Sequence, residues 1–264
     1  MLCEHLVWMK KKAFSDLMVE VLWMLSLAKN NVPHHHNDTH EAPMAPFKTV
    51  SEEEVQRVNR LQRTTFDKLY DLFEPPLPEG VPERLENIVA HGNINRGDTV
   101  LDVGSGTGIL IPIINKYEPM RIYACDLSEA MLEQLGSKKY PNVETIVADV
   151  RDLRLPDGSI NVVFINACYG NIVDKAGAFS NAARMMKAGG RMVISHPLGK
   201  SFIHSRRAPV SFPLDQFPEK DEAESLFKPF GFEIETFIDE PELYILVVSK
   251  CKGTRGRPQI HHSE

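Results

Sequence analysis

The sequence predicts an α/β domain built on a doubly wound, mostly parallel sheet. From residue 98 onward, short β-branched runs alternate with helical patterns, and this alternation is typical of βαβ units. A loop with three alternate glycines at 104–108 follows the first run and opens a helix. The last two runs are joined by a bend too short for a crossover helix, so we expect them to pair antiparallel.

The strands of this sheet are expected in seven short segments. They lie at Thr99–Val103, Ile122–Cys125, Val143–Val147, Val162–Ile165, Met192–Ser195, Phe232–Ile238 and Leu243–Ser249. Helices are expected between them at about 108–117, 128–136, 172–188 and 218–227, because apolar residues recur there at helical spacing.

Two further helices are expected ahead of the sheet. Ser51 and Glu54 fit a capping box, and apolar residues at helical spacing continue to Tyr70, before Pro75-Pro76. The second helix fits residues 82–91. Its first residue is a proline, which suits the first turn of a helix.

Residues 1–50 differ from the rest and are expected to form an extension of a domain at 51–250. Apolar spacing predicts an amphipathic helix over 13–28, which packs on the domain or serves in targeting or at a membrane surface. The polar stretch after it is interpreted as a solvated linker, with weak metal binding as the alternative; it carries His34, His35, His36 and His40. The tail at 251–264 is expected to be basic and flexible.

Composition limits the class of protein. The 264 residues are 42% hydrophobic and 25% charged, and 30 Lys and Arg against 36 Asp and Glu give a net charge of −6. A protein that mainly holds a nucleic-acid backbone is usually basic, so a nucleic-acid partner is not expected. Four cysteines without a CxxC pair argue against a zinc site or a disulfide framework.

The same sequence gives expectations on location. No apolar run reaches the roughly 18 residues that a transmembrane helix needs, so no integral membrane contact is expected. Widely spaced cysteines favour a reducing compartment. We therefore expect a soluble cytoplasmic protein, or an organellar one if residues 1–50 are a targeting segment.

The segment 100–110 is the most informative part of the chain. Its glycines remove side chains where a ligand would approach backbone N–H groups at a helix N-terminus. A nicotinamide-dinucleotide site would need a small residue at position 109, which is Ile109. Asp102 precedes the first glycine by two residues, and its carboxylate would repel a pyrophosphate but suit a ligand with an ammonium group.

With this motif the chain resembles the class I methyltransferases that use S-adenosylmethionine, especially the small-molecule, type 11-like branch, over about residues 64–250. The resemblance implies a seven-stranded sheet with an antiparallel last strand, S-adenosylmethionine as cofactor, and methyl transfer to a small organic acceptor. It also implies which residues hold the methionine end of the cofactor: Asp102, Gly104, Ser105, Gly106 and Gly108. No metal is expected, and the oligomeric state stays open.

Two more strand ends carry candidate cofactor ligands. Asp126 ends the second strand, where an acidic residue can accept from both ribose hydroxyls, although alone it would more often be a helix cap. Leu127 and Met131 follow, and Met131 suits an adenine face. In the resembled family, the residue matching Asp149 accepts from the adenine amino group, and the backbone N–H matching Val150 donates to the ring.

The fourth and fifth strand ends supply the remaining candidates. Asn166 and Tyr169 match the ends of the Asp/Asn/Ser-Pro-Pro-Tyr/Phe motif of amino-group methyltransferases, but the two prolines are absent. Asn166 is expected to contact the cofactor, and Tyr169 either packs in the core or lines the acceptor pocket. His196 is either structural or the base for a hydroxyl or enol acceptor. Asn161 replaces the family's usual acidic residue and is expected to weaken one structural hydrogen bond.

Three features leave alternatives open. His204, Arg206 and Arg207 lie in a loop expected to cover the acceptor, where they either pair with an anionic substrate or are solvated. Tyr70 is a candidate for closing over the cofactor. The rival interpretation of the whole chain is a methyltransferase-like binding or assembly protein without turnover, because a fold does not fix function.

Overall fold

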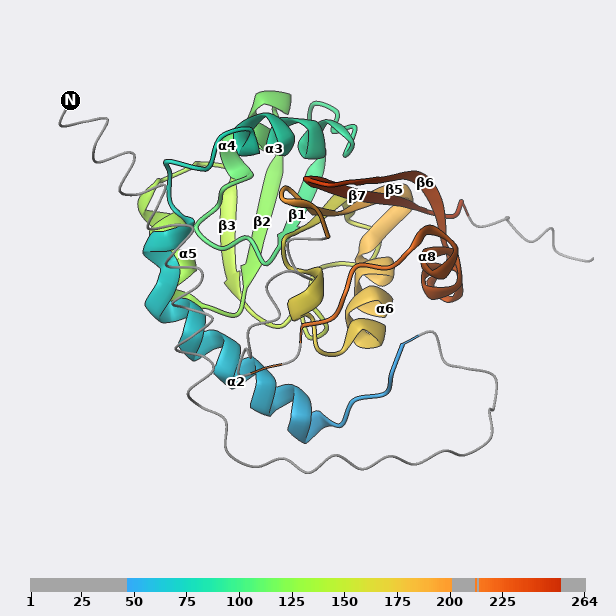
Figure 1. Cartoon of the computed structure of the whole chain (residues 1–264). Helices are drawn as coiled ribbons and strands as arrows, with labels where there is room; N and C mark the ends of the chain where they lie inside the picture. The colour runs from blue at the N-terminus through green and yellow to red at the C-terminus, as the bar shows by residue number, and fades with distance from the viewer. Residues whose placement is uncertain (1–46, 201–211, 213, 253–264) are drawn as a thin grey trace, which may run out of the picture.

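The computed structural model describes residues 47–200, 212 and 214–252. The expected helix at 13–28, the histidine stretch, the Arg206-Arg207 pair and most of the tail lie outside the described residues. Everything below concerns the described part of the chain, which Figure 1 draws in colour.

Seven strands form one sheet in the order β3-β2-β1-β4-β5-β7-β6. Their bounds are Thr99–Val103 (β1), Arg121–Asp126 (β2), Val143–Val147 (β3), Ile160–Asn166 (β4), Met186–His196 (β5), Phe232–Glu240 (β6) and Leu243–Lys250 (β7). Strands β1 to β5 are parallel, and β7 lies antiparallel between β5 and β6. The expected fold class and the antiparallel last strand are confirmed.

Helices cover both faces of this sheet (Figure 1). Their bounds are Glu52–Leu69 (α2), Val81–Ala90 (α3), Ile111–Ile114 (α4), Glu129–Ser137 (α5), Lys175–Met185 (α6) and Lys220–Phe227 (α8). Side chains of α3, α4 and α5 share one buried cluster with the sheet, and those of α6 and α8 share the other. All five residues of β1 are buried, as expected for a strand covered on both sides.

Some helix bounds differ from the expected ones, for local reasons. The helix expected at 108–117 is only four residues long as α4, because Gly108 has a φ of +85° and a 3-10 turn follows at Asn115–Tyr117. The helix expected at 172–188 starts at Lys175, because the Asp174 side chain caps it by accepting from Gly177 N at 2.9 Å.

Phe47 extends the folded domain ahead of the expected boundary at residue 51. Its ring stacks on Phe179 at 5.4 Å and meets Phe227 edge-on at 6.2 Å. Both partners belong to the buried cluster under α6 and α8. Phe47, which is partly buried, therefore packs against this core cluster.

Asn161 supplies a hydrogen-bond acceptor at the position where the resembled family usually has an acidic residue. Its Oδ1 accepts from the backbone N–H of Thr99 at 3.0 Å and from Lys187 Nζ at 2.8 Å. The amide oxygen thus supplies an acceptor at the start of β1.

Sheet order places the functional edge. The chain reverses its winding direction between β1 and β4, which are neighbours in the sheet. In doubly wound sheets, ligands bind outside the carboxyl ends of the strands at this point. Helix α2 crosses near that edge of the sheet in Figure 1.

Candidate cofactor and acceptor cavity

A cavity of about 260 Å³ lies at the carboxyl ends of β1 to β5. It collects most of the candidate residues that the sequence singles out: Asp102, Gly104, Ser105, Gly106, Asp126, Leu127, Met131, Asp149, Val150, Asn166 and His196. Gly108 and Tyr169 do not line it. Residues from five separate strand ends are thus brought to one hollow.

The three loop glycines, Gly104, Gly106 and Gly108, all have positive φ but differ in what surrounds them. A Cβ on Gly104 would lie 2.3 Å from Cys168 Sγ, and one on Gly108 would lie 2.4 Å from Leu135 Cδ1. These two glycines allow close packing of the loop on its neighbours. A Cβ on Gly106 would meet nothing nearer than Met131 Sδ at 3.8 Å. Gly106 therefore faces the open cavity, as a glycine that admits a ligand should.

Asp126 ties the end of β2 to this loop. One carboxylate oxygen accepts from Gly106 N at 2.9 Å, and the other accepts from Ser128 N at 2.9 Å. Burial raises the pKa of Asp126, and hydrogen bonds from backbone N–H groups oppose that rise. A carboxylate offers about four acceptor sites, so Asp126 keeps capacity for a further donor.

Asp102 is a buried carboxyl group with an unpartnered atom. Its residue is 2% exposed, and Oδ2 has no hydrogen-bond partner among the described residues. Burial, with the neighbouring Asp126 charge as the second cause, raises the pKa of Asp102 to about 8. The buried hydroxyl of Ser105 also lacks a partner there. Such groups are costly unless a ligand pairs with them, so they fit a ligand carrying an ammonium group.

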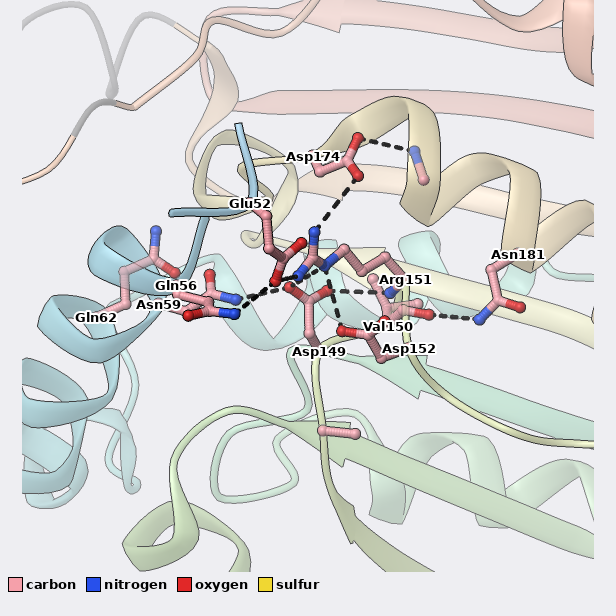
Figure 2. A network of polar contacts seen from close by, with 12 residues as sticks. Glu52, Gln56, Asn59, Gln62, Asp149, Val150, Arg151, Asp152, Asp174 and Asn181 are labelled. Atoms are coloured by element: carbon pink, nitrogen blue, oxygen red, sulfur yellow. Dashed lines mark hydrogen bonds and ion pairs between the residues drawn. The ribbon is translucent and has the colours of Figure 1, made fainter. Parts of the chain in front are cut away.

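Asp149 at the end of β3 is held from two sides (Figure 2). Its Oδ2 accepts from Asn59 Nδ2 of α2 at 2.7 Å, and its Oδ1 accepts from Arg151 N at 3.0 Å. The Arg151 guanidinium in turn pairs with Glu52 of α2 at 2.8 Å. Glu52 and Asn59 were not among the residues singled out from the sequence.

Helix α2 makes further hydrogen bonds along the same edge. Gln62 Nε2 donates to Asn171 O at 2.8 Å, after the end of β4, and Arg63 Nε donates to Leu127 O at 3.0 Å, after the end of β2. Gln62 is only 2% exposed. A glutamine on the buried face of an amphipathic helix was the sequence signal that could have marked α2 as part of the site.

A second group of residues that line the cavity is apolar and was also missed by sequence reasoning. Its walls come from α2, the 3-10 turn after it, α3 and the loops after β1 and β5: Phe66, Phe73, Leu77, Pro78, Val81, Leu85, Ile109 and Leu198. Tyr70 is not among the lining residues. The aromatic side chains that α2 and the next turn place there are Phe66 and Phe73, whose ring centroids are 6.0 Å apart.

Tyr169 packs in the core and does not line the cavity. Its ring is stacked 5.2 Å from Phe217, and Lys175 Nζ lies 4.9 Å from its centroid. Burial raises the pKa of its hydroxyl. Of the two interpretations of Tyr169, the structure favours core packing, because the 3-10 turn at Tyr169–Asn171 directs the ring to Phe217 and Phe179.

His196 does line the cavity, but as a neutral ring. Its Nδ1 is 3.2 Å from the backbone N of Leu198, which is a donor. Nδ1 must therefore accept, and the ring proton is assigned to Nε2. Burial lowers the pKa of His196 to about 4. The accepting nitrogen is thus occupied, which disfavours His196 as a strong general base.

Comparison with known proteins agrees with this geometry. Residues 101–194 match the family model described as a methyltransferase domain. This stretch includes the glycine loop and the ends of β1 to β4. Over these residues the chain is therefore similar to methyltransferase domains. The cofactor that such a domain implies is S-adenosylmethionine, the cofactor named for the matched structures.

Relatives of this methyltransferase domain include enzymes named for quinone biosynthesis. Demethylmenaquinone methyltransferase of Paenarthrobacter aurescens is 31% identical over 147 residues, which cover 51% of this chain and 55% of that protein. The ubiquinone/menaquinone biosynthesis C-methyltransferase of Klebsiella pneumoniae is 26% identical over 181 residues, 62% of this chain and 72% of that protein. This chain spans about half the length of the first relative.

The fold has solved counterparts. A SAM-dependent methyltransferase from Aquifex aeolicus superposes with a TM-score of 0.54 at 18% identity, covering 70% of this chain and 98% of that one.

Within the described ranges, no cluster of three or more His, Cys, Asp or Glu side chains suits a metal ion. None of the described helices combines the length and apolar character needed to cross a membrane.

Proposed function

We propose that the chain is an S-adenosylmethionine-dependent methyltransferase whose acceptor is a small organic molecule with an apolar body. The observation that carries this proposal is one cavity with two unlike sets of lining residues. One set is the glycine loop with Asp126 and Asp102, whose Oδ2 has no partner in the described part of the chain, and the other set is apolar. The two sets suit a charged nucleoside cofactor and an apolar acceptor.

Three carboxylates would hold the cofactor. Asp102 would pair with its ammonium group, because a buried unpartnered carboxyl gains a charge-assisted hydrogen bond there. Asp126 would accept from the ribose hydroxyls, and Asp149 would accept from the adenine amino group. Met131, beside Gly106, would contact the adenine face. When bound, S-adenosylmethionine supplies an electrophilic methyl group.

The chain's contribution to the reaction would be alignment and exclusion of water. The walls from α2 and α3 would hold the acceptor against the cofactor end, and such positioning alone can lower a barrier by about 7–11 kcal/mol in the best cases. Phe66 and Phe73 would contribute apolar surface to this alignment, because both line the cavity.

The nucleophile would have to be activated already in the acceptor. His196 is neutral, and its accepting nitrogen is held by Leu198 N–H. Cys168 lines the cavity too, but burial raises the pKa of its thiol, which keeps it protonated. An electron-rich ring carbon, as in a hydroquinone, meets this requirement better than a neutral alcohol. The names of the quinone-related relatives support the same class.

A transfer assay with labelled S-adenosylmethionine tests the proposal. The full chain is incubated with a demethylmenaquinol analogue, a catechol and a primary amine, which offer carbon, oxygen and nitrogen nucleophiles. Label is expected in the hydroquinone ring at a rate at least tenfold above the other two. Label in the amine or catechol alone would overturn the acceptor class. Cofactor binding without transfer to any of the three would favour the binding or assembly protein instead.

A further inference from the structure

Asn59 of α2 forms a hydrogen bond to a carboxylate that faces the cavity. Its Nδ2 lies 2.7 Å from Asp149 Oδ2, and both residues line the cavity. Because an ionised carboxylate only accepts, the amide must present its nitrogen and not its oxygen. The two residues are 90 positions apart in the chain, so this contact is a product of tertiary folding.

The opposite oxygen of Asp149 is fixed as well. Arg151 N donates to Oδ1 at 3.0 Å, and the Arg151 guanidinium lies 3.5 Å from Oδ2 (Figure 2). The Asp149 side chain is 17% exposed, so water can reach only part of it. With one donor on each oxygen, the plane of the carboxylate is set, and about two of its four acceptor sites stay available.

We infer that Asn59 is a positioning residue that makes the cavity selective for an adenine base. It acts by holding the Asp149 carboxylate in the orientation that accepts from an amino group. This inference rests on the proposed function, in which Asp149 faces the adenine. A base with a carbonyl in place of the amino group would set oxygen against a fixed carboxylate, and it would be rejected because two acceptors cannot pair.

The position of Asn59 is itself fixed by the rest of α2. On the N-terminal side of Asn59, the Glu52–Arg151 ion pair at 2.8 Å anchors the helix. On the C-terminal side, Gln62 Nε2 anchors it by donating to Asn171 O at 2.8 Å. Val55 and Val58 of the same helix are buried. Asn59 is thus presented from a supported helix and not from a loop, which is what a selective contact requires.

Competitive titration calorimetry of the full chain tests this inference. The ligands are S-adenosylhomocysteine and its deaminated analogue S-inosylhomocysteine, which carries the carbonyl. The wild type is expected to prefer the adenine ligand at least tenfold. Asn59→Ala should lower that preference about tenfold, mainly by weakening S-adenosylhomocysteine. Asn59→Asp, which replaces the donor with an acceptor of the same shape, should lower it further.

Two control variants separate selectivity from helix docking. Glu52→Ala removes one anchor of α2, while Gln62 and the buried Val55 and Val58 still hold the helix that carries Asn59. Thr64→Ala alters an exposed residue of the same helix. Both should keep the wild-type preference, even if Glu52→Ala lowers the melting temperature. Equal loss of preference in Glu52→Ala and Asn59→Ala would overturn the inference, because helix docking alone would then explain it.

Other outcomes are distinct from failure of the proposed function. If the wild type binds neither ligand, the cofactor site is wrong, and both proposals fall. If the wild type prefers S-adenosylhomocysteine but Asn59→Ala keeps or increases that preference, only the inference about Asn59 is wrong. An increase would mean that the Asn59 amide competes with the base for Asp149.

Discussion

The carboxylate of Asp126 accepts a hydrogen bond from the backbone N–H of Gly106 at 2.9 Å. One residue ends β2, and the other is the loop glycine that faces the cavity. Asp126, which is expected to bind the ribose, therefore also holds the loop that would bind the methionine end of the cofactor. Changes at either residue should therefore affect the same ligand.

Replacing Asp126 by Ala is expected to weaken binding of S-adenosylmethionine by about 1–3 kcal/mol, which is roughly 5- to 150-fold. The ribose hydroxyls would lose their acceptor, and the Gly106 N–H would lose its partner. Calorimetry on the variant measures the change. Glu129→Ala, which removes an exposed acid three residues later, should bind like the wild type. Unchanged affinity of Asp126→Ala would remove Asp126 from the site.

Gly106→Ala and Gly97→Ala form a matched pair. Both glycines have positive φ, +54° and +83°, and no atom lies within 3.4 Å of an added Cβ at either. The backbone cost of about 1 kcal/mol should be similar in the two variants. Only the Cβ at Gly106 enters the cavity. Gly106→Ala should therefore lose at least tenfold in cofactor affinity while Gly97→Ala loses none, and Gly106→Val should abolish binding. Equal affinities in all three would show that the ligand does not sit on this loop.

The buried carboxyl group of Asp102 should favour cofactor binding but lower the stability of the empty chain at neutral pH. Its folded pKa is about 8, above the ordinary value of about 4. Between these values the folded chain holds a proton that the unfolded chain has lost. Asp102 therefore contributes a fall of about 1.4 kcal/mol per pH unit to the free energy of unfolding as the pH rises through that window.

Asp102→Asn is neutral at every pH and removes this slope. Its melting temperature should exceed that of the wild type by an amount that grows between about pH 5 and pH 8 and then levels off. Its affinity for S-adenosylmethionine should fall, because the charge-assisted contact to the ammonium group is lost. A melting-temperature difference that is constant over the whole range would contradict the raised pKa.

The N-terminal boundary gives a test of the core. A chain shortened to begin at Met44 keeps Phe47 and is expected to fold and bind cofactor. A chain that begins at Ser51 loses the contacts of Phe47 with Phe179 and Phe227 and should be less stable by about 1–3 kcal/mol. Thermal melting of the two shortened chains beside the full chain measures both effects. A collapse of the melting temperature already at Met44 would place residues before it in the core.

The fold and the cofactor end were predictable because their signals are local. The glycine loop follows β1 directly, and the acids at 102, 126 and 149 lie at or close to the carboxyl ends of β1, β2 and β3. Parallel strands bring these ends to one edge of the sheet. The contributions of Asn59, Gln62 and Phe66 were not predictable, because they depend on how α2 lies over that edge. Tyr169 shows the same limit, since only the turn at Tyr169–Asn171 decides that its ring enters the core.

Hydrogen exchange of the backbone amides, with and without saturating S-adenosylmethionine, tests the central claim most directly. The claim is that one cavity at the carboxyl edge of the sheet binds this cofactor. The cofactor is expected to slow exchange at 104–108, 126–131 and 149–151, and in α2, while β6 and α8 exchange as before. The claim would be contradicted if exchange at 104–108 stayed as fast with saturating S-adenosylmethionine as without it. It would also be contradicted if only other segments exchanged more slowly.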